Sequence, residues 1–479
     1  MFQQQTSTWY IRLLSFVLFC YLVSRAALCG ITYDEAWTLT SFVPSSFQDI
    51  LTFENCDANN HLLNTLSIKL LYSILPDTLF VARLPSLVGG LLYLLYAGRL
   101  SQRYSPVSSL MCFTLISLNP FVLEFFSLAR GYGLGLGMLV AGLYHGLLFS
   151  EQRSNKQLFL SQLFLSVAIT AALSYLHLYL AAQVLLFISL LRGERKKLLS
   201  GLLIQAGIAM AAGLLLYGPI QKLRANDNLY YGGHTGIYED SLLSLSSYFS
   251  GGPPAGSEVR IFLNTFLVLL FFLFVNILRR REKKPVGLLF FLILLGLSFF
   301  SISAQYHLMN TLYVTDRTAL FLYPLLILFL AELVECLRLI AWQRFLSALL
   351  TTCFLLNFLI NANVYKTSTW FFDAHSEAVI RYLSERENTQ SANLQCSWPM
   401  SKSLAYYRDR LYPSLSMQYK SRDAASTAGD YYLYLATGID QVDYARGREH
   451  LLAAEKDTLL AFEAEHLYLF RLKKGVVHE

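Results

Sequence analysis

Charged residues are scarce in this sequence, in which Asp, Glu, Lys and Arg make up only 15% of 479 residues. A soluble protein carries about 25% of these residues, so much of this chain does not contact water. The deficit is concentrated in residues 10–362, where long apolar runs follow one another, whereas residues 363–479 have ordinary mixed polarity. This distribution excludes a soluble enzyme, a disordered chain and a nucleic-acid-binding protein.

The sequence also lacks the common ligand-binding patterns of cysteine and glycine. Its seven cysteines form no C-x-x-C pair and lie mostly in apolar runs, so we interpret them as small apolar side chains rather than a disulfide framework or zinc site. Gly131, Gly133, Gly135 and Gly137 follow no predicted strand and depart from the nucleotide-binding pattern G-x-G-x-x-G. Small residues four positions apart are typical of packed membrane helices. A nucleotide-binding loop is therefore not expected at these glycines.

Long apolar segments are abundant instead. A helix that spans a membrane needs about 20 predominantly apolar residues, and eleven segments meet or approach that length. They lie near residues 10–30, 79–98, 106–123, 131–149, 158–174, 177–191, 198–217, 261–278, 286–304, 318–337 and 345–362. The predicted fold class is therefore an α-helical polytopic membrane protein with about eleven transmembrane helices.

Basic residues mark every second link between these segments. The five basic links contain Arg99 and Arg103, Arg153 and Lys156, Arg192 to Lys197, Arg279 to Lys284, and Arg338 and Arg344. Lys and Arg concentrate in cytoplasmic loops, so the alternation predicts a multi-pass protein of the inner (plasma) membrane with a cytoplasmic N-terminus. Residues 363–479 are then periplasmic or extracellular. The weakest division is at residues 174–177, because a single helix over 158–191 would invert every later loop.

The first outer loop, residues 31–78, carries the acidic pair Asp34-Glu35 just beyond the first span. A carboxylate there can reach a substrate whose head group lies at the membrane surface. The alternative interpretation is a pair of solvated loop carboxylates, or the N-terminal acids of a short helix. Later in the loop, residues 61–75 have apolar side chains at helical spacing over only about 22 Å. A span needs about 30 Å, so we predict an amphipathic helix lying in the outer interface.

Several short motifs follow the acidic pair in a fixed order. They are the helix that begins at His61, Ala82-Arg83-Leu84-Pro85-Ser86 at the start of the second span, Asn119-Pro120 at the end of the third, Ala129-Arg130-Gly131-Tyr132 at the start of the fourth, and Asp316-Arg317 before Tyr323-Pro324. In this order, over about residues 8–335, the chain resembles the family 39 glycosyltransferases. These enzymes have the GT-C architecture and include protein O-mannosyltransferases and lipid A aminoarabinose transferases.

The resemblance implies an inverting hexosyl- or pentosyltransferase that moves a sugar from a polyprenyl-phosphate donor to an acceptor at the outer face of the membrane. The acceptor is a glycan, a lipid or a protein, and membrane lipids are the other partners. Asp34 would be the general base on the acceptor hydroxyl, and Glu35 would orient the acceptor or a neighbouring cation. The leaving phosphate needs positive charge or hydrogen-bond donors, which Arg130 and Arg317 would supply. The alternative for each arginine is that it extends to lipid head groups at a helix end.

Asn60, His61, Tyr132 and His177 complete the predicted substrate-binding residues. Some relatives bind a divalent cation, but Asn60 stands where the aminoarabinose transferases have an acidic ligand, and His61 is not followed by two prolines. A single histidine with no adjacent carboxylate is a poor cation site. We therefore prefer hydrogen bonding of the substrate by Asn60 and His61, assign no cofactor, and leave a divalent cation open.

Two domains are predicted: a GT-C-like transmembrane domain over residues 1–362 and a small extracytoplasmic α/β domain over residues 363–479. In the second, a helical pattern runs to residue 386, and the runs 431–435, 459–462 and 467–470 are typical of strands. Two other functions stay open, a lipid-linked sugar flippase or transporter and a polysaccharide polymerase or ligase. Charged residues are nearly absent from the spans and no pair of broken helices suggests an inverted repeat, which disfavours a transporter.

Overall fold

The computed structural model describes residues 2–193, 195–250, 256–279, 285–386, 393–396, 398–419, 431–435, 456–465 and 467–472. The chain divides into two compact units. The first comprises Met1–Ala27 and Ser45–Asn363, and the second comprises Leu28–Pro44 and Val364–Glu479. The acidic pair therefore lies in the same unit as the C-terminal residues, whereas the boundary predicted at residue 362 put it with the membrane helices.

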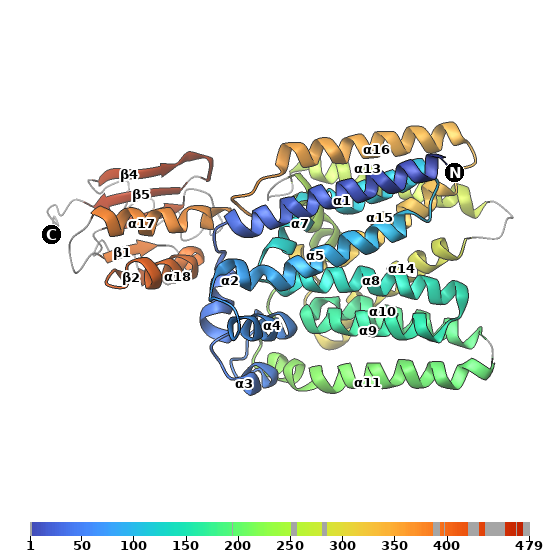
Figure 1. Ribbon diagram of the computed structural model, residues 1–479, viewed down its shortest axis with the longest axis horizontal. Coiled ribbons are helices and arrows are strands. Elements are labelled where there is room, and N and C mark those ends of the chain that lie inside the picture. Colours follow the sequence, from blue (N-terminus) through green and yellow to red (C-terminus); the bar gives the residue numbers. More distant parts are fainter. Residues whose placement is uncertain are drawn as a thin grey trace. The chain divides into compact units, whose positions relative to one another are not determined.

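The first unit is built from long helices that run roughly parallel to one another (Figure 1). They are α1 (Phe2–Leu28), α5 (Leu79–Ser101), α6 (Pro106–Ser117), α8 (Gly131–Gln152), α9 (Asn155–Ala171), α10 (Leu176–Leu191), α11 (Arg195–Ala225), α13 (Ser257–Leu278), α14 (Val286–Met309), α15 (Leu322–Glu335) and α16 (Ile340–Asn361). The shorter elements are α3 (Phe47–Thr52), α4 (Leu62–Tyr72), α7 (Pro120–Glu124), α12 (Ser244–Ser247), η2 (Phe125–Ser127), η3 (Leu173–Tyr175), η4 (Ile237–Leu243), η5 (Tyr248–Ser250) and η6 (Asp316–Ala319). Ten of the eleven predicted spans thus correspond to one main helix each, and the span predicted at 106–123 corresponds to α6 followed by α7.

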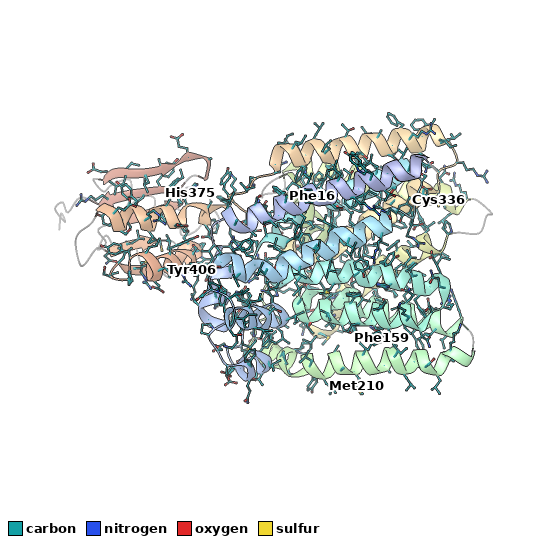
Figure 2. All side chains as sticks on the ribbon, in the orientation of Figure 1. Phe16, Phe159, Met210, Cys336, His375 and Tyr406 are labelled. Atoms are coloured by element: carbon teal, nitrogen blue, oxygen red, sulfur yellow. The ribbon has the colours of Figure 1, made fainter. Side chains whose placement is uncertain are left out.

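Within the described residues, eight helices are long and apolar enough to cross a membrane, or up to nine if a bent pair is one span. Two predicted spans are shorter, since α9 has 17 residues and α15 has 14. Large apolar side chains are exposed on the outer surfaces of α1, α9 and α11, among them Phe16, Phe159 and Met210 (Figure 2). The chain is therefore an integral, multi-pass membrane protein. Residues 280–284 of one predicted basic link lie outside the described residues, and the sidedness inferred from the basic links stays a prediction.

Two breaks between helices have clear local causes. The predicted span 106–123 is not one straight helix, because α6 and the segment Pro120–Ser127 meet at an angle of 60°. Asn119 accepts a hydrogen bond from Val122 N at 3.2 Å and so caps α7, and proline at the first helical position favours a new start there. In contrast, the division predicted at residues 174–177 is confirmed: η3 separates α9 from α10.

Glycines allow α8 to lie in the centre of the bundle. A Cβ atom on Gly137 would lie 2.1 Å from the backbone oxygen of Gly89 on α5, and one on Gly133 would lie 2.1 Å from the oxygen of Phe125. No side chain fits at either place. The glycine series is therefore a helix-packing surface, as the sequence predicts.

The second unit contains a five-stranded sheet with the order β2-β1-β3-β5-β4. The strands are β1 (Asn393–Cys396), β2 (Ser416–Tyr419), β3 (Tyr431–Leu435), β4 (Lys456–Phe462) and β5 (Leu467–Leu472). β1 is parallel to β2 and β3, and the pairs β3–β5 and β5–β4 are antiparallel. The other elements are α2 (Tyr33–Trp37), η1 (Thr38–Phe42), η7 (Phe371–His375), α17 (Ser376–Arg386), η8 (Trp398–Met400), α18 (Ser401–Leu411) and η9 (Glu463–Glu465). The predicted small α/β domain is confirmed.

Candidate active site

The acidic pair lies in the first turn of α2. Thr32 caps this helix, because its hydroxyl accepts a hydrogen bond from Glu35 N at 3.4 Å, while the Glu35 carboxylate accepts one from Thr32 N at 3.0 Å. This reciprocal arrangement is a capping box, which satisfies backbone donors that a helix start otherwise leaves unpaired. Glu35 is fully buried. Its carboxylate therefore shapes the turn on which Asp34 stands.

A third carboxyl group, Asp373 of η7, lies beside this turn in the second unit. Its Oδ2 accepts a hydrogen bond from Tyr33 N at 2.6 Å, and its Oδ1 accepts one from the Ser403 hydroxyl at 2.5 Å. Burial raises the pKa of Asp373 well above its ordinary value, and the carboxylates of Asp34 and Glu35 raise this pKa further. Sequence reasoning missed Asp373, since an acid that follows an aromatic run carries no sign of a partner 340 positions away.

His61 lies at the start of α4 in the first unit and is 7% exposed. Its Nδ1 lies 3.1 Å from the backbone oxygen of Ala171. A carbonyl oxygen can only accept, so Nδ1 carries the hydrogen and Nε2 presents a lone pair. Burial lowers the pKa of His61 well below its ordinary value, and the nearby charge of Arg130 lowers this pKa further. His61 is therefore neutral near pH 7 and acts as a hydrogen-bond acceptor.

Arg130 is the residue before α8 and is 2% exposed. Its guanidinium donates to the side-chain oxygen of Asn59 and lies over the ring of Tyr132, 5.6 Å from the centroid. The ring of Tyr132 also meets the His61 ring edge to face, with 4.7 Å between centroids. The structure thus brings together four predicted site residues, because Asn60 directly precedes His61.

The face of α4 that is turned toward the protein carries polar groups beside the apolar Leu62 and Ile68. Among the described residues, four side chains here have buried polar atoms without a hydrogen-bond partner: Asn60 Oδ1, His61 Nε2, Asn64 Oδ1 and Nδ2, and Thr65 Oγ1. Leaving such an atom unpaired costs about 1–3 kcal/mol. Sequence reasoning named only the first two, although Asn64 and Thr65 follow His61 at the helical spacings i+3 and i+4 and this spacing could have identified them.

His177 and Arg317 lie further from His61 but are connected to it through neighbouring side chains. The Tyr175 hydroxyl donates to the backbone oxygen of Tyr132 at 3.0 Å, and the ring of Tyr175 meets that of Phe321 at 6.0 Å. His177 stacks on Phe321 at 6.1 Å. Because η3 and η6 pack together, Arg317 belongs to the same end of the unit, and its charge also lowers the pKa of His61.

Arg317 is held by the long loop that follows α11. Its guanidinium donates to the Tyr231 hydroxyl at 3.0 Å and lies 4.1 Å from the centroid of the Tyr231 ring. Tyr231 in turn donates to Asp316 at 2.9 Å. The pairing of Tyr231 with Asp316 and Arg317 is a tertiary contact that no local sequence pattern specifies.

The donors near His61 fit a divalent cation poorly. No group of three or more His, Cys, Asp or Glu side chains among the described residues could hold a metal ion. Asn60 and His61 are neutral, and the positive charge of Arg130 lies beside them, whereas hard cations prefer carboxylate oxygens. We therefore derive no step through a cation.

Comparisons with known proteins identify the fold. No protein-family profile matches the chain, and no curated protein sequence matches it. Among solved structures, apo ArnT from Cupriavidus metallidurans aligns with a TM-score of 0.56 at 11% identity, covering 97% of this chain and 98% of that one. The same protein bound to undecaprenyl phosphate aligns with a TM-score of 0.49 at 10% identity, covering 96% and 97%. The likeness to the apo structure shows that this chain has the GT-C fold, while membership of family 39 stays a prediction.

Proposed function

We propose that this protein is a membrane glycosyltransferase that moves a sugar from a polyprenyl-phosphate donor to an acceptor hydroxyl at the outer face of the membrane. The observation that carries the proposal is the cluster at the start of α4, where Asn60 and His61 have buried polar atoms without a hydrogen-bond partner and the charge of Arg130 acts on His61. Buried polar and charged groups are expensive in a membrane protein and mark substrate paths. The GT-C fold and the acidic turn of α2 support the same function.

We assign the donor phosphate to Arg130. A guanidinium group can donate two parallel hydrogen bonds to a phosphate, and the contacts with Asn59 and Tyr132 limit its motion. The 22-residue helix α8 begins at the next position, Gly131. Its first backbone N–H groups and helix dipole favour an anion there. Arg317, whose charge also reaches His61, is assigned to the same anionic group at a greater distance.

His61 and Asn60 are assigned to the hydroxyl groups of the sugar. The Nε2 atom of His61 accepts a hydrogen bond, since Nδ1 donates to Ala171. Asn60 donates through Nδ2 to the backbone oxygen of Ile50 at 3.3 Å, which leaves its Oδ1 to accept. Two neutral acceptors suit hydroxyl donors and add no positive charge, so the phosphate and the sugar are recognised by different residues.

Asp34 is assigned as the general base. It takes the proton of the acceptor hydroxyl while that oxygen forms a bond to the anomeric carbon and the bond between that carbon and the phosphate oxygen breaks. The phosphate leaves with the bonding electron pair, and Arg130 stabilises its charge. Attack on the face opposite the leaving group inverts the anomeric centre. Glu35 is assigned to the cap of α2 rather than to the acceptor, because its carboxylate bonds Thr32 N.

The substitution Asp34→Asn tests this function. It removes the base and keeps the size of the side chain, so we expect transfer from a labelled polyprenyl-phosphate sugar to fall about 10²- to 10⁴-fold. The assay uses purified full-length protein with a panel of lipid-linked sugars and membrane-extracted acceptors. Asp409→Asn is the matched control, because Asp409 is an exposed acid paired with Arg408, and it is expected to leave the rate unchanged.

Transfer at the wild-type rate by Asp34→Asn would contradict the proposed mechanism. The two alternatives give other results. A flippase moves the lipid-linked sugar across reconstituted vesicles without forming a new glycosidic bond, and a polymerase or ligase yields a product with many sugars per acceptor. A single transferred sugar, lost in Asp34→Asn, supports the glycosyltransferase.

A further inference from the structure

The acidic turn is attached to the C-terminal domain along its length. Ile31 N donates to the hydroxyl of Tyr407 at 3.1 Å, and Tyr33 N donates to Asp373 at 2.6 Å. The rings of Tyr33 and Trp398 meet edge to face with 5.8 Å between centroids. α2 also packs on α18. The turn is therefore structurally a part of the C-terminal domain, although some 330 residues separate them in the chain.

Asp373 is central to this attachment. It is 2% exposed, and its two carboxylate oxygens accept hydrogen bonds from different elements, Tyr33 of α2 and Ser403 of α18. The Ser403 hydroxyl also pairs with that of Ser376 at 3.1 Å, at the start of α17. A buried carboxyl group is costly unless it is satisfied, and here its bonds join three helices at one point.

The carboxylate of Asp373 gives Tyr33 N a hydrogen-bond acceptor, which the short helix α2 does not contain. α2 has only five residues, and a helix of that length is not stable alone. The first N–H groups of any helix have no partner within it. Thr32 accepts from Glu35 N, and Asp373 accepts from Tyr33 N. Because the second bond holds the residue immediately before Asp34, it fixes the direction in which the Asp34 side chain leaves the backbone.

We propose that Asp373 is a positioning residue for sugar transfer, which orients the Asp34 carboxylate by holding the first turn of α2. This inference rests on the proposed role of Asp34 as general base. It gives the C-terminal domain a part in the reaction, because that domain completes the catalytic turn. Asp373 itself does not touch the substrate.

Three variants of the full-length protein test the proposal. Asp373→Ala removes both acceptors, and we expect kcat to fall about 10- to 100-fold, since small misplacements of a catalytic group are costly. KM for the donor should stay within about 2-fold, because the residues assigned to the donor belong to the first unit. Asp373→Asn keeps an oxygen for Tyr33 N and gains an NH₂ group that can donate to Ser403, so kcat should recover to within about 5-fold of wild type. The control, Asp409→Asn on α18, should leave kcat unchanged.

Hydrogen exchange of residues 30–44 gives a readout that does not depend on activity. Faster exchange there in Asp373→Ala, with unchanged exchange in α8 and a lower kcat, supports the proposal. A wild-type kcat in Asp373→Ala overturns it, and so does a lower kcat with unchanged exchange of residues 30–44. If Asp373→Ala does not fold, Ser403→Ala replaces it with an expected loss in kcat of about 3- to 10-fold, and a wild-type kcat in that variant also overturns the proposal. Full activity of Asp34→Asn would instead contradict the proposed function. The failure of the proposed function is thereby distinguished from the failure of the positioning role of Asp373.

Discussion

Arg130 and His61 differ in charge although they share a neighbour, the ring of Tyr132. Burial and the nearby arginines keep His61 neutral, so near pH 7 the positive charge at this place is that of the guanidinium. The two side chains consequently have different chemical preferences, an anion for Arg130 and a hydroxyl group for His61. A sequence shows which residues occur but not which of them is protonated, so this division could not be predicted.

Arg130→Lys tests the assignment of the phosphate. Lysine keeps the charge but loses the planar pair of donors, so we expect kcat/KM for the donor to fall about 10- to 100-fold, or about 1.4–2.7 kcal/mol. Steady-state kinetics with the labelled donor measure the change. Arg99→Lys is the control, because Arg99 lies over the ring of Tyr96 in a similar way, 5.0 Å from the centroid, but on a predicted cytoplasmic link. Equal effects of the two substitutions would argue against a phosphate contact at Arg130.

At the scale of elements, α4 buries polar side chains that an amphipathic helix usually exposes. Its polar side chains Asn64 and Thr65 are fully buried, whereas Leu70 and Ile74 at or beyond its C-terminal end are 58% and 73% exposed. Leu62 and Ile68 are buried as well, at 3% and 0% exposed, so the face turned toward the protein carries both polar and apolar side chains. The apolar spacing predicted the helix, since periodicity is local. Which face meets the protein depends on α5, α8 and α9 and could not be read from residues 61–75.

For breaks between helices, too, the sequence predicts the position but not the geometry. Ser174-Tyr175-Leu176-His177 is a polar interruption within an apolar run, and it does divide two helices. Asn119-Pro120 is a similar signal, but the sequence gives no angle, and the 60° bend depends on how α7 packs. The strands β3, β4 and β5 were predicted from short apolar runs, whereas β1 and β2 were not. The order of the strands in the sheet could not be predicted, because pairing is a long-range property.

Gly137→Ala tests the close contact between α5 and α8. The new Cβ atom would lie 2.1 Å from the backbone oxygen of Gly89, so the helices must separate, at a cost of about 1–3 kcal/mol. We expect a lower Tm in detergent, measured by thermal unfolding. Gly207→Ala on α11 is the matched control, since nothing lies within 4 Å of its added Cβ, and it should leave stability unchanged or raise it by up to about 1 kcal/mol. A Tm of Gly137→Ala equal to that of the control would refute the contact.

At the scale of the whole molecule, each unit is built from two separate segments of the chain. It passes from the first unit to the second at residue 28, returns at residue 45 and leaves again at residue 364. The two predicted domains did not anticipate this exchange, because nothing in the composition of residues 28–44 distinguishes a loop of the membrane domain from a part of another domain. Only the contacts with α18 and Asp373 reveal it.

Reporter fusions test the predicted sidedness. Alkaline phosphatase, which is active only outside the cytoplasm, should be active when fused after Asn228 or Glu479 and inactive after Arg103, because Lys and Arg mark the cytoplasmic links. The fusion after Asn228 is the most informative, since the division of residues 158–191 into α9 and α10 determines its side. Fluorescent protein fused at the same three positions should give the opposite pattern. An inactive phosphatase after Asn228 would mean that the predicted alternation of cytoplasmic and outer loops is wrong.

The hydrogen bond between Tyr33 and Asp373 also sets an order for biosynthesis. The acidic turn leaves the ribosome among the first segments, but its partner follows 340 residues later. At about 5–20 residues per second, translation of that interval takes about 17–70 s. During this time the membrane helices can insert while the turn lacks its anchor, and a chain terminated before residue 373 never acquires it. The acidic turn is thus made early and completed late, so under the proposed function a nascent chain should not transfer sugar before its C-terminal domain has folded.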